Sequence, residues 1–211
     1  MNSEHVKPDS EFREANSIVH STVQLGDKVI VWHWSQLRED VTVGSASSIG
    51  QGVYVGPGVT IGRNCKVQNG AQIYEPAVIH DGVFIGPNAV LTNDKKPRAV
   101  THGTGAMKSV DDWEKVGVQI NTGASLGANV VCVAPVVVGE WAMIGAGTVV
   151  TKDVKPYALF AGNPGRQIGW VGRGGSKLIQ SSNGFQCPDT GDRYELSPGE
   201  FLLRLSGSPK A

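Results

Sequence analysis

In this 211-residue chain, Glu75 and Asn93 are two polar residues whose side chains could take part in chemistry together, and they lie 18 positions apart. The carboxylate of Glu75 can accept a hydrogen bond or a proton. The amide of Asn93 can donate and accept hydrogen bonds but cannot take up a proton at neutral pH. His33, Gln51 and Asn69 form a second polar series with the same spacing. Whether such groups meet depends on the element that carries them.

A six-residue repeat provides that element, and it runs without a change of phase from Ala15 to Thr92. The fifth position is Val, Leu or Ile in all 13 hexads, the third is Ser, Ala, Cys or Val, and the sixth is often Gly. After an interruption the pattern resumes at Thr122. A fixed short period is typical of a solenoid, in which each unit stacks only on its neighbours.

Each hexad predicts one short strand and one corner, with the aliphatic fifth residue pointing inward. Three hexads close a triangular coil, and coils stack at about 4.8 Å, so residues 18 positions apart lie directly above one another. We therefore expect Asn93 above Glu75 at the corner from which the long loop leaves. A second corner then carries Pro87, Asn69, Gln51 and His33 in one column. Any one of these residues also suits a turn for purely structural reasons.

The repeat predicts an all-β protein, a parallel β-helix of about six coils with one long ejected loop and a short C-terminal extension. We expect a flexible arm over residues 1–14, the β-helix over 15–163 with the loop at 93–121, and the extension over 164–211. Within the extension, residues 165–178 are expected to form a short helix or turn, and residues 185–205 a small hairpin.

The composition excludes several classes of partner. The 19 basic and 19 acidic residues balance, so neither a nucleic-acid nor a membrane partner is expected. The first residues contain no apolar stretch typical of a signal peptide, and three cysteines are too few and too scattered for a disulfide framework. The histidines form no closely spaced pair and the tail has one cysteine, so we expect no metal site. A cytoplasmic protein is the simplest expectation.

Several runs, read in order, carry a resemblance to a known family: IVWHWSQL, QGVYVGPGVTIG, KVQNGAQIYE, FIGPNAVLTND, TGASLGANV, IGAGTVVTKDV, FAGNPGRQIGW and CPDTGDRY. Over about residues 15–195, the chain resembles the sugar-nucleotide 3-N-acetyltransferases. The resemblance implies a left-handed helix and a homotrimer with active sites between subunits. It also implies transfer of an acetyl group from acetyl-CoA to the 3-amino group of UDP-2-acetamido-3-amino-2,3-dideoxyglucuronate, for O-antigen or surface polysaccharide biosynthesis.

Two alternatives stay open beside this interpretation. A sister group acts on dTDP-3-amino-3,6-dideoxyhexoses, and the coils alone do not separate the two, although the CPDTGDRY tail is more like the UDP-uronate group. A non-catalytic β-helix scaffold is the other alternative, but an inert scaffold has little reason to eject a 29-residue loop above Glu75. The chain departs from the family's usual VYNPRA and GVPA runs at residues 94–99 and 162–165, and its loop is longer.

The resemblance and the stacking rule together give the candidate site residues. Asn93 would orient the amine, Glu75 would bind it and accept its proton, and the amide of Gly139, one coil above Asn93 once the loop is removed, would hold the oxyanion. The candidate substrate-binding residues are Gln51, Lys66, Gln68, Asn69, Tyr74 and Arg98. The candidate residues for acetyl-CoA are Gly145, Lys152, Lys155, Asn163 and Arg166.

Overall fold

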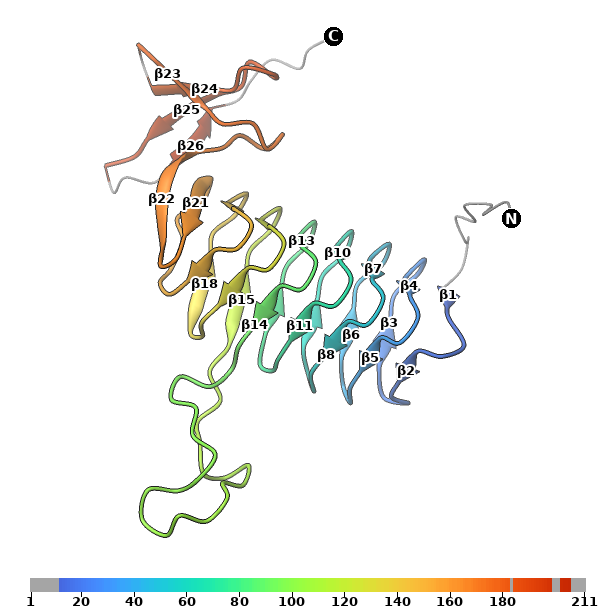
Figure 1. The fold of residues 1–211 in the computed structure, drawn as a ribbon. Helices are drawn as coiled ribbons and strands as arrows, with labels where there is room; N and C mark the ends of the chain where they lie inside the picture. The colour runs from blue at the N-terminus through green and yellow to red at the C-terminus, as the bar shows by residue number, and fades with distance from the viewer. Residues whose placement is uncertain (1–11, 183, 199–201, 206–211) are drawn as a thin grey trace.

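The computed structural model describes residues 12–182, 184–198 and 202–205, and all regular elements in them are β-strands. The strands build a solenoid along which the chain runs from one end to the other, with one loop projecting from its side and a small sheet at the far end (Figure 1). The all-β solenoid predicted from the repeat is therefore confirmed.

The three faces of the solenoid are three sheets, here named A, B and C. Sheet A contains β1 (Phe12–Arg13), β4 (Ile30–Val31), β7 (Ser48–Ile49), β10 (Lys66–Val67), β13 (Phe84–Ile85), β16 (Ser125–Leu126), β19 (Met143–Ile144), β21 (Ala158–Gly162) and β22 (Gly165–Trp170). Sheet B contains β2 (Ile18–Val19), β5 (Gln36–Leu37), β8 (Tyr54–Val55), β11 (Gln72–Ile73), β14 (Val90–Leu91), β17 (Val131–Cys132) and β20 (Val149–Val150). Sheet C contains β3 (Gln24–Leu25), β6 (Thr42–Val43), β9 (Thr60–Ile61), β12 (Val78–Ile79), β15 (Val118–Ile120) and β18 (Val136–Val138).

Sheet A shows that the solenoid is longer than predicted. It has nine strands, of which β22 is antiparallel and the other eight are parallel, so there are about eight turns rather than about six. The first turn begins earlier than the repeat indicates, because Phe12 pairs with Ile30. The last turns continue although their sequence no longer follows the hexad, as the bridge between Val138 and Val154 shows.

The core consists of the third and fifth hexad residues, stacked in columns inside the prism. Ile73, for example, is fully buried and lies in register with Val55 below and Leu91 above. Cys132 joins the same column, and burial raises the pKa of its thiol to about 12. Because inward residues 18 positions apart are partners on adjacent turns, the hexad period determines the register of the uninterrupted turns.

Glycine serves two different purposes at the corners. At the second hexad position Gly52 has φ of 67°, a left-handed conformation that strains residues with a Cβ. At the sixth position Gly56 is needed for space, because an added Cβ would overlap the carboxylate of Glu75 on the next turn. The second kind of glycine makes room for a side chain of the candidate site.

The loop leaves the solenoid after β14 and returns at β15, projecting far from the body of the protein (Figure 1). Bridges between Asp94 and Lys115 and between Val100 and Met107 hold its two legs together. Sheet C resumes at Val118, so the last residues of the predicted loop range, 93–121, already belong to the solenoid.

The C-terminal extension differs from the helix-or-turn and hairpin expected from its sequence. Residues 165–170 form β22, which pairs antiparallel with β21 and covers the last edge of sheet A. A four-stranded antiparallel sheet follows, made of β23 (Ile179–Ser181), β24 (Gly184–Gln186), β25 (Arg193–Leu196) and β26 (Leu202–Leu205). The guanidinium of Arg173 lies 4.2 Å from the ring centroid of Trp141 and fixes the extension to the solenoid.

Two structural features are absent from the described residues. None of them forms a helix with the length and hydropathy of a membrane span. Among the same residues, no group of three or more His, Cys, Asp or Glu side chains is arranged so that it could hold a metal ion.

Candidate functional site

The mouth of the loop lies at the corner between sheets B and C. Leu91 is in register with Ile73, and this register places Asn93 one turn above Glu75, as the 18-residue period predicts. Tyr74 lies at the same corner, and the centroid of its ring is 5.3 Å from the ring centroid of Tyr54. The structure therefore brings Tyr74, Glu75 and Asn93 together, while the roles proposed for them stay predictions.

Glu75 is held on several sides. Its side chain is 16% exposed, its Oε1 accepts a hydrogen bond from Lys115 Nζ at 3.0 Å, and its other oxygen lies over Gly56. Lys115 reaches this position because the returning leg of the loop pairs with the leaving leg: the N–H of Val116 donates to the carbonyl of Asn93 at 3.0 Å. The position of Lys115 could not be predicted from the sequence, since the loop has no period from which it could be derived.

The expected position of Gly139 is wrong. Leu91 pairs with Cys132, so the residue one turn above Asn93 is Ala134. Gly139 lies instead above Asn121, at the corner between sheets C and A, and its N–H donates to the carbonyl of Val154 at 2.9 Å. An amide that is already bonded within the solenoid, at another corner, cannot hold an oxyanion beside Asn93.

A second polar group lies at the corner between sheets A and B. Gln51, Gln68 and Asn69 line an open groove of about 270 Å³ together with the half-exposed ring of Trp32. The backbone N–H of Gln51 donates to Asn69 Oδ1 at 3.0 Å, which fixes the amide of Asn69. Lys66 lies nearby on the outer face of sheet A. Amides beside an exposed indole suit the recognition of a sugar or a nucleobase.

The predicted substrate-binding residues thus fall into separate places. Gln51, Lys66, Gln68 and Asn69 lie on or beside sheet A, whereas Tyr74 lies at the loop corner. Arg98 is exposed in the projecting loop, where its Nη1 donates to the carbonyl of the preceding Pro97. Within one chain these groups do not form one pocket.

The residues predicted to bind acetyl-CoA are also divided among the corners. Gly145 lies between sheets A and B, and Asn163 and Arg166 belong to the β21–β22 hairpin, which is tied to that region by the N–H of Gly162 donating to Thr148 Oγ1 at 3.3 Å. Lys152 lies at the corner between sheets B and C, one turn above Ala134. Lys155 lies near Gly139, at the third corner.

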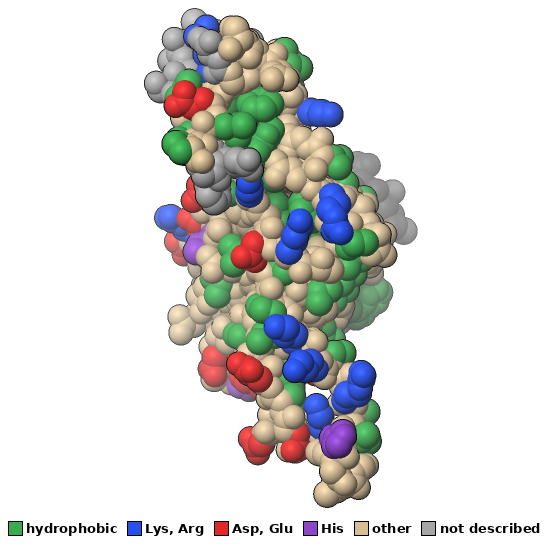
Figure 2. Space-filling model, turned by 90° about the vertical axis from the view of Figure 1, so that its left-hand side faces the viewer, with side chains coloured by type: hydrophobic (Ala, Val, Ile, Leu, Met, Phe, Trp, Pro, Cys, Tyr) green, Lys and Arg blue, Asp and Glu red, His purple; other side chains and the backbone are tan. Residues whose placement is uncertain are grey.

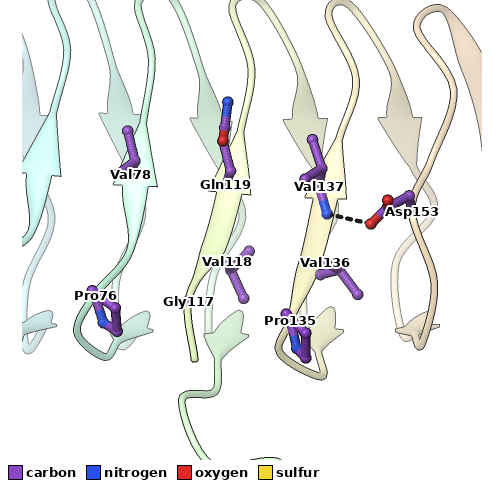
Figure 3. Close-up of a pocket in the computed structure, with 9 residues that line it drawn as sticks. All are labelled: Pro76, Val78, Gly117, Val118, Gln119, Pro135, Val136, Val137 and Asp153. Atoms are coloured by element: carbon purple, nitrogen blue, oxygen red, sulfur yellow. Dashed lines mark hydrogen bonds between the residues drawn. The ribbon is translucent and has the colours of Figure 1, made fainter. Parts of the chain in front are cut away.

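A groove of about 380 Å³ on the outer face of sheet C was not predicted from the sequence (Figure 3). It begins at Pro76, next to Glu75, and ends at Asp153, whose Oδ1 accepts a hydrogen bond from the N–H of Val137 at 2.8 Å. Its remaining lining residues are Val78, Gly117, Val118, Gln119, Pro135 and Val136. The signal for it was present in the outward, apolar fourth-position residues Val78 and Val137.

The charged side chains around the loop are separated by sign. In Figure 2, Lys and Arg side chains gather along one flank of the lower part of the molecule and acidic side chains along the opposite flank.

Below the loop corner, Arg38 donates two hydrogen bonds of 2.8 Å to Glu39, and these bonds lower the pKa of the Glu39 carboxyl. Glu39 is therefore paired within its own turn and is not free to pair with groups near Glu75.

Comparison with known proteins finds that the repeats are similar to two known kinds of hexapeptide repeat. The profile of the bacterial transferase hexapeptide, six repeats, matches residues 40–73 and 58–93, and that of the hexapeptide repeat of succinyl-transferase matches residues 116–152. Over 80 residues the chain is 48% identical to a dTDP-3-amino-3,6-dideoxy-alpha-D-galactopyranose 3-N-acetyltransferase of Aneurinibacillus thermoaerophilus, covering 38% of this chain and 41% of that protein. A putative serine acetyltransferase of Schizosaccharomyces pombe is 30% identical over 73% of this chain and 49% of its own length. The chain thus spans less than half of each of these relatives.

Two solved structures superpose on the solenoid of this chain. A galactoside acetyltransferase in complex with coenzyme A superposes with a TM-score of 0.52 and 27% identity, covering 67% of this chain and 70% of that one. A putative acetyltransferase of Bacillus cereus has a TM-score of 0.50 at 21% identity, covering 76% of this chain and 83% of that one, which shows the fold alone. The repeats of this chain are similar to those of the bacterial transferase hexapeptide, and the solenoid they form matches a left-handed parallel β-helix.

Proposed function

We propose that the chain is an acetyl-CoA-dependent N-acetyltransferase whose acceptor is a nucleotide-linked 3-amino sugar. The observation that carries the proposal is the half-buried carboxylate and amide of Glu75 and Asn93, stacked at the mouth of the loop. They lie on a solenoid whose repeats match those of transferases. The relatives named as acetyltransferases support the same reaction class.

The reaction joins the amine nitrogen to the carbonyl carbon of the thioester. The carbon–sulfur bond breaks as the tetrahedral intermediate collapses. The nitrogen gives up one proton to become an amide, and CoA takes up one proton and leaves as the thiol, so no net proton is consumed. Asn93 would orient the amine or the intermediate by hydrogen bonding, because its amide has no basic site. Glu75 would accept a hydrogen bond from the amine and fix its lone pair toward the thioester.

The groove on sheet C is the place we assign to the donor. It is elongated and open, and its lining combines the apolar side chains of Val78 and Val137 with the amide of Gln119, which suits a pantetheine arm with its two amides. It starts beside Glu75, where the thioester must lie (Figure 3). Lys152 lies near its upper end and is available for the phosphates of CoA. In this arrangement the donor contacts sheet C rather than the corner that contains Gly145.

Two nucleotides are candidates for the carrier of the acceptor sugar, UDP and dTDP. The resemblance of the motifs predicts the UDP-linked uronate, whereas the relative that shares 48% identity over 80 residues is named for a dTDP-linked sugar. Thiol release from acetyl-CoA, measured with both amino sugars side by side, tests the proposal. We expect release with one of them, and the sugar that reacts identifies the acceptor. Release with neither, together with failure to bind CoA, would favour a scaffold.

We further propose that the functional unit is a homotrimer with sites between copies, because Gln68 and Asn93 lie at different corners of one chain. Asn93→Ala and Gln68→Ala chains should each be poorly active alone. When the two are co-expressed with different tags and purified as mixed oligomers, about a quarter of the sites at equal amounts would contain neither substitution. We expect activity to return to about that fraction of the wild type. Activity no higher than that of the separate variants would place both residues in one copy's site or in none.

A further inference from the structure

Lys115 is the cation that contacts Glu75. Its Nζ lies 3.0 Å from Glu75 Oε1 and 5.9 Å from the ring centroid of Trp113. The backbone of Lys115 is fixed by its bridge to Asp94, directly after Asn93. This pair connects the projecting loop to the carboxylate beside which the acceptor amine is proposed to bind.

The other charged and titratable groups around Glu75 do not pair with its carboxylate. Asp94 accepts a hydrogen bond from the N–H of Lys96 at 2.7 Å, and the ring of Tyr74 packs against that of Tyr54 at the same corner. Two turns below Glu75, Arg38 and Glu39 neutralise each other. The charge of Glu75 is therefore balanced by Lys115.

That balance matters for an amine substrate. A 3-amino sugar is nucleophilic only as the free amine, whereas a lone carboxylate with little exposure would stabilise its ammonium form. An opposite charge within a few ångströms shifts a pKa by about one to three units toward the charged form. A carboxylate already paired with an ammonium still accepts a hydrogen bond from the amine but exerts a much weaker field on it.

We propose that Lys115 is a positioning residue that neutralises Glu75, so that the site binds the acceptor as its free, reactive amine. This inference rests on the proposed acetyl transfer. Because Lys115 is brought to Glu75 only by the pairing of the two loop legs, the long loop has a defined task. It delivers the counter-charge that sets the protonation state of the bound amine.

The test compares Lys115→Met, which keeps the length of the side chain without its charge, with Lys115→Arg, which keeps the charge. The rate kcat of thiol release is measured from pH 6 to pH 10 with the acceptor that the wild type uses. We expect Lys115→Met to move the midpoint of the rise in kcat upward by about one unit. At pH values below the midpoint, a shift of this size lowers kcat about tenfold. Lys115→Arg should restore the wild-type dependence of kcat on pH. Lys96→Met, another exposed lysine of the loop, is the matched control and should leave the profile in place.

Two further measurements separate this role from a structural one. In Glu75→Gln protein no carboxylate remains to be neutralised, so Lys115→Met should cause no additional shift there. Without acetyl-CoA, Lys115→Met protein should bind the amino sugar more tightly at pH 6 than the wild type does, as measured by calorimetry. An equal loss of kcat at every pH, or unchanged binding at pH 6, would overturn the inference. A wild-type protein that acetylates neither sugar would instead contradict the proposed function.

Discussion

Asn93→Ala is expected to lower kcat for acetyl transfer about a hundredfold, because it removes a hydrogen-bonding group from the place where charge develops in the transition state. The KM for acetyl-CoA should change little, since the proposed donor groove on sheet C does not include Asn93. Steady-state kinetics with varied acetyl-CoA and a saturating acceptor measure both parameters. The substitution leaves the fold in place, because the backbone carbonyl of Asn93, which accepts from Val116, is retained.

Gln24→Ala is the matched control for this substitution. It also removes an exposed amide from the solenoid, but on β3, away from the loop. Its kcat should equal that of the wild type within experimental error. If Asn93→Ala turned over as fast as Gln24→Ala, the assignment of Asn93 to the reaction would have to be abandoned.

Ile73→Ala is expected to cost about 2–5 kcal/mol in the free energy of unfolding, through lost apolar burial and the cavity left behind. Ile73 is fully buried and stacks between Val55 and Leu91. The solenoid is narrow, so no second layer of side chains can move in to fill the space. Urea unfolding followed by circular dichroism measures the loss as a lower midpoint.

Ile18→Ala provides the comparison, since Ile18 is 65% exposed on the outer face of β2. Its midpoint should lie close to that of the wild type, because little apolar surface is uncovered. Equal effects of the two substitutions would contradict the assignment of the fifth hexad position to the core.

The hexad repeat was sufficient to predict the solenoid and its register. An inward aliphatic residue recurs at every sixth position, and a shift by one residue would turn the whole column outward. Lys66 accordingly pairs with Ser48 below and Phe84 above, and Asn93 comes to lie above Glu75. The number of turns was underestimated, because strands outside the counted hexads, Phe12–Arg13 and Val118–Ile120, also belong to the coils.

The position of Gly139 could not be predicted in the same way. The stacking rule placed Gly139 above Asn93 only if residues 93–121 were all loop, but Val118–Ile120 already form a strand of sheet C. The turn that contains the loop therefore runs from Val90 to its partner Val131, and the stacking above Asn93 shifts accordingly. An insertion breaks the period, and the sequence does not state where the solenoid ends and the loop begins.

By itself, then, the sequence determined the elements whose contacts are between neighbouring turns: the three parallel sheets, their core and the stacking of Asn93 on Glu75. Only the tertiary structure decided what lies outside the repeat. It brought Lys115 to Glu75, opened the groove on sheet C, and formed the four-stranded sheet that Arg173 fixes against Trp141. The reason is physical: a periodic contact is encoded in each hexad, whereas the contacts of a loop and a terminal extension depend on where the chain folds back in three dimensions.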